Sequence, residues 1–404
     1  PPVGSPMAGP AGSGLSATTT PGGRDRPPIE AAVCRAGRVT LAGAGVPRWP
    51  PGRMPPTPAD ELRDLADVVA DLGAGTGSGV GADAGAWDRY GDHGPVAALE
   101  ARLADLLGKP AVAVFPSGIM AQQSMLRVWC DTRGSRRVAI PALSHLLRSE
   151  DDGPRLLHGF RFEHLTDGPS VPGVDDLAAI PGRLGAALLE LPLRDAGFLL
   201  PRWDDLVAFS QACRDRGVPL HLDGARIWES APALQHSPAQ IAALADSVYV
   251  SFYKGLGGLA GAALAGPVDE IAEARRWRTR MGGTLFTLLP YAVAALRGLE
   301  QELPRMAEYH ERAVTIAAGL QAHGIRVSPS PPHTTAFRIH VERGVEDCAQ
   351  RRLRAMEDER VALTPRWAAS EVPGWSWTEF GVGPATMAWE VEEIIDTLVR
   401  VFGR

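Results

Sequence analysis

The chain has 404 residues, a net charge of −6, and ordinary shares of apolar (45%) and charged (22%) residues, which predicts a soluble globular protein with room for two domains. The acidic balance and the lack of a basic tract argue against nucleic-acid binding. No apolar run reaches the roughly 18–20 residues that cross a bilayer, so we expect no membrane span. Cys34, Cys130, Cys213 and Cys348 form no Cys-x-x-Cys pair, and we expect reduced thiols in a cytoplasmic protein without a metal site.

Residues 1–58 are rich in proline, glycine, alanine and threonine, and they lack the basic start and apolar core of a signal peptide. Because this composition buries too little apolar surface to offset its ordering entropy, we expect a largely flexible arm. The glycine-rich stretch 73–85 is typical of a loop or linker. We expect a large domain over 59–310 and a small C-terminal domain over 311–404.

From residue 87 onward, apolar strands alternate with amphipathic helices. Up to residue 266, the expected helices are 95–107, 119–130, 204–216 and 238–244, and the expected strands are 111–115, 138–140, 186–189, 218–222, 248–252 and 262–265. The alternation predicts an α/β fold with a mainly parallel sheet, which would bind ligands at the carboxyl ends of its strands. In the rest of the chain we expect helices at 268–280, 288–318, 345–358 and 390–402, and strands at 326–328 and 336–340.

Lysine occurs only twice, at Lys109 and Lys254, among 41 lysine and arginine side chains. An amine can lose its proton in an apolar site and act as a nucleophile, which a guanidinium cannot do. Lys254 lies on a glycine-rich turn between two apolar strands, so we interpret it as a catalytic residue. Lys109 follows a helix end, and we interpret it as a surface residue.

Three other strand ends carry polar groups. Gly118 lies at a strand-to-helix turn, where the free amides of the first helical turn favour an anion such as phosphate. Asp223 follows a buried strand and is either a functional acid or the cap of the next turn. His145 ends a third strand, and a histidine in such a place is by itself more often structural.

Together these groups match the needs of pyridoxal phosphate. Lys254 would form a Schiff base with the aldehyde of this cofactor, and Asp223 would keep its pyridine nitrogen protonated. The helix that begins near Gly118 would bind the phosphate, and Arg226 would bind a substrate carboxylate through two hydrogen bonds.

The chain resembles the threonine aldolase and β-eliminating lyase family of fold-type I pyridoxal phosphate enzymes. The matching segments are Tyr90-Gly-Asp-His, Phe115-Pro-Ser-Gly-Ile-Met-Ala, His145 with Glu150 and Gly153, Glu190 through Ala196-Gly197, His221-Leu-Asp-Gly-Ala-Arg226, Lys254-Gly-Leu-Gly, and Arg275-Arg-Trp-Arg with Gly282-Gly283. The resemblance implies a mainly parallel-sheet large domain with a smaller C-terminal α+β domain.

The resemblance also implies roles for individual residues. The catalytic residues would be Lys254, His145 (stacked on the cofactor ring), Asp223 and Arg226. The cofactor site would comprise Ser117, Gly118, Ile119, His145, Asp223, Arg226, Ser251 and Lys254. Tyr90, Arg278 and Arg280 would approach a site shared with another subunit, which implies a dimer or tetramer of identical chains.

The chain departs from the family pattern at three places. After Glu190, Leu193 replaces a histidine that lies close to the substrate hydroxyl. The usual Asp-x-x-Ser-Asp segment is not evident near the N-terminus. The last third lacks the usual second carboxylate-binding arginine, for which Arg338 and Arg366 are candidate substitutes.

We therefore expect a lyase that cleaves β-hydroxy-α-amino acids to glycine and an aldehyde. With Leu193 in place of the histidine, His145 or a water is the expected base, and an apolar substrate side chain would suit the leucine. One alternative keeps the cofactor but changes the reaction to β-elimination, β-replacement or racemisation. Another is a sensor or scaffold of the same fold without turnover, for which the missing arginine and the N-terminal arm are the motivation.

Overall fold

The computed structural model describes residues 57–73, 86–359 and 361–403. Residues 1–56 of the predicted N-terminal arm, residues 74–85 of the predicted linker and Cys34 lie outside these described residues. All the described residues belong to one compact unit. Among their helices, we find none with the length and apolar character that crossing a bilayer requires.

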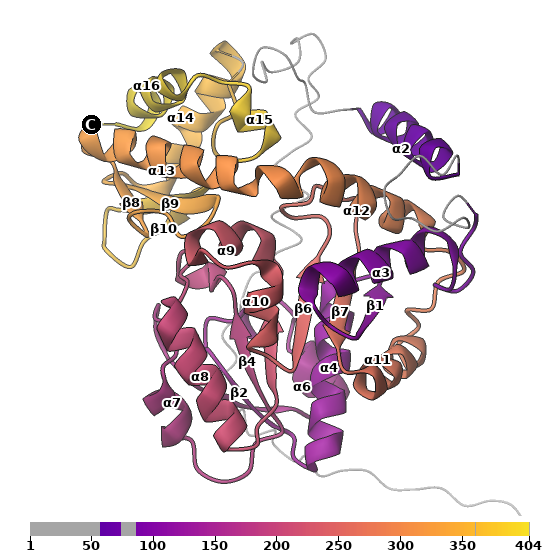
Figure 1. Ribbon diagram of the computed structural model, residues 1–404. Coiled ribbons are helices and arrows are strands. Elements are labelled where there is room, and N and C mark those ends of the chain that lie inside the picture. The colour runs from indigo at the N-terminus through magenta and orange to yellow at the C-terminus, as the bar shows by residue number, and fades with distance from the viewer. Residues whose placement is uncertain (1–56, 74–85, 360, 404) are drawn as a thin grey trace, which may run out of the picture. The chain divides into compact units, whose positions relative to one another are not determined.

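The large sheet has seven strands in the order β1-β7-β6-β5-β4-β2-β3. They are β1 (Ala111–Phe115), β2 (Arg137–Ile140), β3 (Arg161–His164), β4 (Ala186–Glu190), β5 (Leu220–Asp223), β6 (Ser247–Ser251) and β7 (Ala262–Gly266). Figure 1 labels β1, β7, β6, β4 and β2 of this sheet. Five neighbouring strands, β3, β2, β4, β5 and β6, pair in parallel, whereas β7 runs antiparallel to β6 and β1. The predicted mainly parallel sheet is therefore confirmed. Among the seven strands of this sheet, only β3 had no counterpart in the sequence analysis, since it is a largely polar edge strand.

Helices cover both faces of this sheet. The helices before residue 302, of which α2 packs against α12 and not on the sheet, are α2 (Pro58–Gly73), α3 (Gly94–Leu107), α4 (Gly118–Arg133), α5 (His145–Arg148), α6 (Gly153–His158), α7 (Val174–Ala179), α8 (Trp203–Asp215), α9 (Ile227–Leu234), α10 (Pro238–Ala243), α11 (Val268–Arg280) and α12 (Leu289–Gln301). Side chains from α4 and α11 pack with Phe115 and Ile140 on one face, and those from α3, α8 and α10 pack with Val114 and Leu189 on the other. Strands buried on both faces read as continuous apolar runs, which is why most were predictable.

The small sheet has four antiparallel strands in the order β10-β11-β9-β8. Its elements are η2 (Leu303–Arg305), α13 (Met306–Ala322), β8 (Arg326–Ser328), β9 (Ala336–Val341), α14 (Val345–Asp358), β10 (Ala368–Ala369), β11 (Ser376–Gly381), α15 (Pro384–Met387) and α16 (Val391–Phe402). The predicted helix 288–318 is instead two helices, α12 and α13, with η2 and its Pro304 between them. The predicted domain boundary at 310–311 falls inside α13 and stays a prediction.

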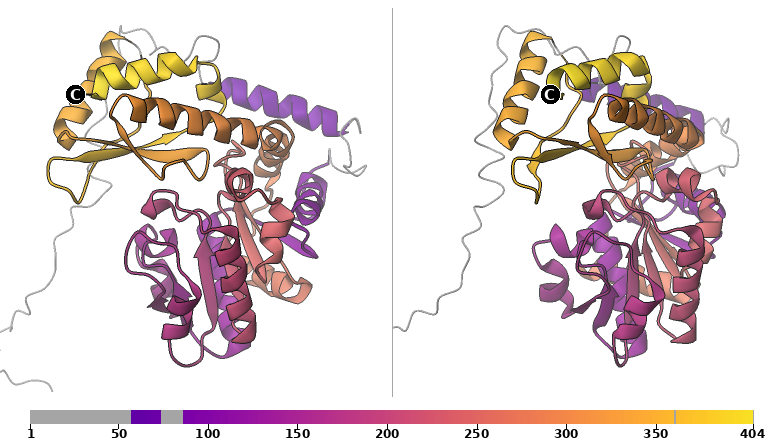
Figure 2. Two further views of the ribbon diagram at one scale, coloured as in Figure 1. Left: turned by 60° about the vertical axis from the view of Figure 1, so that its left-hand side comes forward. Right: turned by 90° about the vertical axis from the view of Figure 1, so that its left-hand side faces the viewer.

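Side chains alternate along β9 and β11. Phe337, Ile339 and Phe380 are buried in a core that includes residues of α13 and α16, and Figure 2 shows α13, α14 and α16 on one face of the small sheet. Arg338 and Glu379, which lie opposite each other across the β9–β11 pair, point to the other face. Both side chains on that polar face contact the loop after β4 of the large sheet, at residues 194 and 195.

Candidate active site

The ends of β4, β5 and β6 form the floor of the candidate site. Glu190 and Asp223 are paired neighbours at the ends of β4 and β5, and Lys254 follows the end of β6. A cavity of about 310 Å³ opens at this edge. It is lined by His145, Glu190, Leu191, Pro192, Arg194, Asp223, Ala225, Arg226, Tyr253 and Lys254. The structure thus brings together the four predicted catalytic residues.

Lys254 is half-buried, and its amine makes no hydrogen bond or ion pair with the described part of the chain. Burial lowers the pKa of Lys254, and Arg226 lowers it further, while Asp223 is the main group that opposes the shift. Lys109 is also half-buried, which differs from its interpretation as a surface residue. Its amine donates to the carbonyl of Ala245 at 2.5 Å, just beyond the end of α10.

Asp223 is buried and both of its carboxylate oxygens accept hydrogen bonds. Gln122 of α4 donates to Oδ2 at 2.7 Å, and the amide of Ala225 donates to Oδ1 at 3.1 Å. The acid therefore both caps its turn and lines the cavity. A carboxylate has about four lone-pair positions, so Asp223 can still accept a proton donor. The sequence analysis did not identify Gln122. Two adjacent glutamines, Gln122 and Gln123, are buried on α4, and such a polar pair in a predicted helix could have indicated a polar contact in the interior.

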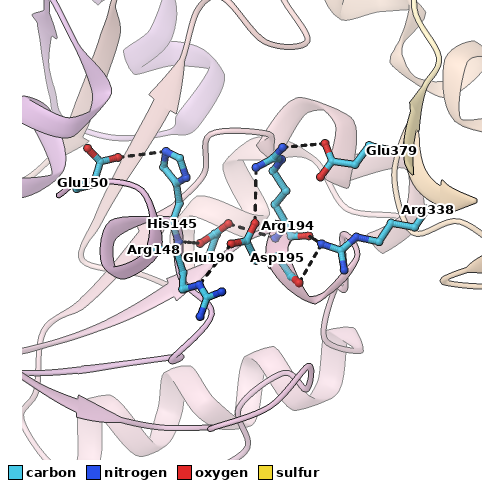
Figure 3. A network of polar contacts seen from close by, with 8 residues as sticks. All are labelled: His145, Arg148, Glu150, Glu190, Arg194, Asp195, Arg338 and Glu379. Atoms are coloured by element: carbon cyan, nitrogen blue, oxygen red, sulfur yellow. Dashed lines mark hydrogen bonds and ion pairs between the residues drawn. The ribbon is translucent and has the colours of Figure 1, made fainter. Parts of the chain in front are cut away.

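The backbone amide of His145 donates to the side chain of Glu190, at Oε2, over 2.8 Å (Figure 3). Burial, together with the nearby Asp223, raises the pKa of Glu190 to about 7. The ring of His145 lies 3.1 Å from Glu150, measured between Nε2 and Oε1, and this hydrogen bond raises the pKa of His145. His145 is thus oriented by two acids, one at its amide and one at its ring.

Arg226 lies against Glu229, with Nη1 donating to Oε1 at 3.3 Å, and its guanidinium lies 5.5 Å from the centre of the Phe198 ring. Glu229 is 1% exposed, and burial raises its pKa. Arg226 and Lys254 also line a second cavity of about 850 Å³ that extends to the polar face of the small sheet. The sequence analysis missed Glu229, because an acid on a short helix has no distinguishing signal.

The start of α4 has the predicted form of an anion site. Ser117 caps the helix, its Oγ accepting from the amide of Met120 at 3.3 Å. A Cβ on Gly118 would lie 2.1 Å from the hydroxyl of Tyr249, so only glycine fits there. The first amides of a helix have no partner inside it, and those of Gly118 and Ile119 belong to this turn. Ser251 ends β6 and is buried.

The three residues predicted to face another subunit lie outside the lining of both cavities. Tyr90 is 54% exposed and makes an edge contact with Phe286. Arg278 is buried, where it donates to the carbonyls of Val114 at 2.5 Å and Tyr90 at 3.4 Å. Arg280 is exposed and pairs with Glu273 at 2.8 Å.

The loop after β4 differs from its sequence interpretation. Leu193 is buried and does not line the cavity, whereas the next residue, Arg194, does. Arg338 donates to backbone carbonyls of this loop, and Arg366 is exposed outside both cavities. Of Arg194, Arg338 and Arg366, only Arg194 lines a cavity, the one of about 310 Å³ at the ends of β4, β5 and β6.

The residues present fit pyridoxal phosphate. Lys254 offers an unpaired amine, Asp223 a buried acid with acceptor capacity left, and the start of α4 a set of free amides at a position that excludes a side chain. Gln122 Oε1, beside Asp223, is buried without a hydrogen-bond partner in the described chain. Within the described residues, no cluster of three or more histidine, cysteine or acidic side chains suits a metal ion.

Fold and site together define an α/β enzyme with a cavity, lined by Lys254 and Asp223, at the edge of a mainly parallel sheet. The family model for beta-eliminating lyase matches residues 78–343, and the chain belongs to this family. Enzymes of the family depend on pyridoxal phosphate, as does this chain. The predictions of family, fold, enzyme class and cofactor are thereby confirmed.

Individual relatives agree with this assignment. Low-specificity L-threonine aldolase 1 of Arabidopsis thaliana is 28% identical over 66% of this chain and 77% of its own length. A crystal structure from Listeria monocytogenes, assigned as an L-allo-threonine aldolase, has a TM-score of 0.77 and 32% identity, covering 88% of this chain and 96% of its own. One from Exiguobacterium, assigned as an aromatic amino acid beta-eliminating lyase/threonine aldolase, has a TM-score of 0.76 and 34% identity, covering 83% and 94%.

Proposed function

We propose that this enzyme cleaves the Cα–Cβ bond of β-hydroxy-α-amino acids to give glycine and an aldehyde. The observation that carries the proposal is the amine of Lys254, which is half-buried, unpaired within the described residues, and shares one cavity with Asp223 and Arg226. The names of the relatives, low-specificity L-threonine aldolase and L-allo-threonine aldolase, support the same reaction.

Pyridoxal phosphate, when bound, supplies an electron-accepting ring that stabilises negative charge at Cα. In this proposal Lys254 would hold the cofactor through its amine, Asp223 would keep a proton on the pyridine nitrogen, and His145 would lie against the ring. The amides of the first turn of α4 and the buried Ser251 would bind the phosphate side. Arg226 binds the substrate carboxylate.

His145 is the base that we propose for the β-hydroxyl proton. If Nε2 donates to Glu150, this tautomer leaves Nδ1 as an acceptor. The loop side chain at Leu193 is not an alternative base, because it is apolar and buried away from the cavity lining.

β-Elimination is the second candidate, because the Exiguobacterium relative is named for both reactions. The test is to incubate the cofactor-loaded protein with L-threonine, L-allo-threonine and phenylserine and to identify the products. Equal amounts of glycine and aldehyde support the aldol cleavage, whereas ammonia and a keto acid support elimination. A protein that holds the cofactor and releases nothing from any of them contradicts both and favours a sensor or scaffold.

We further propose that the enzyme is a homo-oligomer. Trp87, Tyr90, Leu285 and Phe286 are exposed, and the amide of Tyr90 donates to the carbonyl of Phe286 at 2.9 Å, so two separate segments form one apolar surface. Such a surface on a large chain is typical of an interface. Light scattering of the purified protein should give a multiple of 42.9 kDa, and Phe286→Ser should reduce it toward one chain.

A cytoplasmic location remains part of the proposal. Cys130, Cys213 and Cys348 are free and buried, and burial raises the pKa of Cys130 and of Cys213 to about 12, so these thiols are unreactive. A tagged protein should fractionate with cytoplasmic markers.

A further inference from the structure

The loop after β4, residues 191–197, carries an arginine that no motif singles out. Leu193 and Leu199 exchange backbone hydrogen bonds at 2.9 and 3.2 Å, which fixes the buried side of the loop. The amide of Arg194 donates to Glu190 Oε1 at 3.2 Å. Since Glu190 ends β4 beside Asp223, this bond holds Arg194 at the cavity.

Two acids contact the guanidinium of Arg194. Its Nη2 donates to Glu379 at 2.8 Å, and its Nη1 lies 3.6 Å from Asp195 (Figure 3). The side chain is 38% exposed and lines the 310 Å³ cavity with Lys254 and Arg226. A guanidinium has five N–H donors, so Arg194 keeps donors for an incoming carboxylate.

Glu379 comes from the polar face of the small sheet, opposite Arg338 across the β9–β11 pair. Arg338 lies 3.9 Å from the centre of the Trp377 ring and donates to the carbonyls of Arg194 at 3.4 Å and Asp195 at 3.0 Å. The small sheet therefore holds both the backbone and the guanidinium of Arg194. Its own arginine, Arg338, is occupied by this contact and lines neither cavity.

We propose that Arg194 binds the carboxylate of the amino-acid substrate together with Arg226, and that Glu379 positions Arg194 for this contact. The inference rests on the proposed function in taking an α-amino acid as the substrate. Arg226 is partly occupied by Glu229, so a second cation shares the substrate charge. The small sheet, whose Arg338 is occupied by the loop, thus supplies an acid, Glu379, that positions Arg194 of that loop.

The test compares Arg194→Gln and Glu379→Gln with Arg148→Gln. Arg148 is a matched control, because it is exposed and lies 4.0 Å from Asp195 of the same loop but outside the cavity. The probes are glycine and glycinamide, which differ only in the carboxylate, and their dissociation constants are measured by calorimetry on the cofactor-loaded protein. A hydrogen-bonded charge pair predicts that Arg194→Gln weakens glycine binding by roughly 10- to 100-fold.

Glycinamide binding should change by less than about twofold, since this probe presents no charge to Arg194. Glu379→Gln should weaken glycine binding by less than Arg194→Gln, and the double variant should be no weaker than Arg194→Gln, since Glu379 acts through that residue. Arg194→Lys should restore part of the loss, because it keeps the charge without the planar fork.

Three results would overturn the inference: unchanged glycine binding in Arg194→Gln, an equal loss for glycine and glycinamide, or the same loss in Arg148→Gln. Failure of wild type to bind glycine would overturn it as well. If glycine binding depends on Arg194 but no β-hydroxy amino acid is cleaved, the proposed function fails and this inference stands.

Discussion

The two sheets contribute to the same site in different ways. Strands β4 and β5 of the large sheet are buried throughout, and their acids, Glu190 and Asp223, stand at the strand ends. Strands β9 and β11 of the small sheet are buried on one face only, and Arg338 and Glu379 come from the middle of the other face. In the function that we propose, the large sheet supplies the groups that react or hold the cofactor, and the small sheet positions a loop beside them.

This difference predicts graded effects. Changes at the edge of the large sheet remove chemistry or strain a closely packed turn, and they should be severe. Changes on the polar face of the small sheet should alter substrate binding while the catalysed step continues.

The largest effect is expected from Lys254→Ala. Loss of the amine should lower the rate on the order of 10³-fold or more, as for other removals of a catalytic group, and the purified protein should lose the absorbance of its lysine-bound cofactor. Lys109→Ala is the matched control, because Lys109 is the other lysine of the chain and bonds only to a carbonyl. A Lys254→Ala protein with normal rate and colour would contradict the assignment of the site.

Gly118→Ala should strain the turn where the large sheet meets α4. The added Cβ would lie 2.1 Å from the hydroxyl of Tyr249, and overpacking of this kind costs about 1–3 kcal/mol of unfolding free energy. Denaturant unfolding of the apoprotein measures the loss. Gly344→Ala, where a Cβ has open space, should be close to neutral. If the two variants had equal free energies of unfolding, the turn would accommodate the added methyl group and the predicted strain would be contradicted.

Arg338→Met tests the positioning role of the small sheet. It removes the donors to the carbonyls of Arg194 and Asp195 and keeps the length of the side chain. Lost hydrogen bonds of this kind predict a rise in KM of roughly 2- to 12-fold with kcat nearly unchanged. Arg326→Met is the control, since Arg326 of β8 lies over the ring of Trp375, the residue before β11, and no hydrogen bond or ion pair joins it to the loop within the described residues. A large fall in kcat for Arg338→Met would contradict the proposal that the small sheet affects substrate binding and not the catalysed step.

The mildest effect is expected from Glu150→Gln, which should shift the pH profile with little loss of maximal rate. The hydrogen bond to Glu150 raises the pKa of His145; Glu190 also raises it, while burial and Lys254 lower it. If neutral His145 is the base, activity rises with pH through this pKa. Glu150→Gln lowers the pKa, so the acid limb should move to lower pH. Asp151→Asn, at the exposed neighbouring acid, should leave the limb in place.

Much of the fold was predictable because its signals are local. Continuous apolar runs located six of the seven strands of the large sheet, and Pro and Gly marked the ends of helices such as α3. The polar strand β3 and the alternating strand β11 were missed, because neither has an apolar run. The four predicted catalytic residues line one cavity, since the ends of parallel strands meet at one edge.

By itself, the sequence determined the sheet, the chemical identity of the candidate catalytic groups, and their place directly after buried strands, because each follows from neighbours in the chain. Only the tertiary structure decided which distant residues surround them: Gln122 on Asp223 and Glu379 on Arg194. Gln122–Asp223 and Arg194–Glu379 join residues 101 and 185 positions apart. Such contacts depend on how helices and sheets pack, which no local pattern of residues encodes.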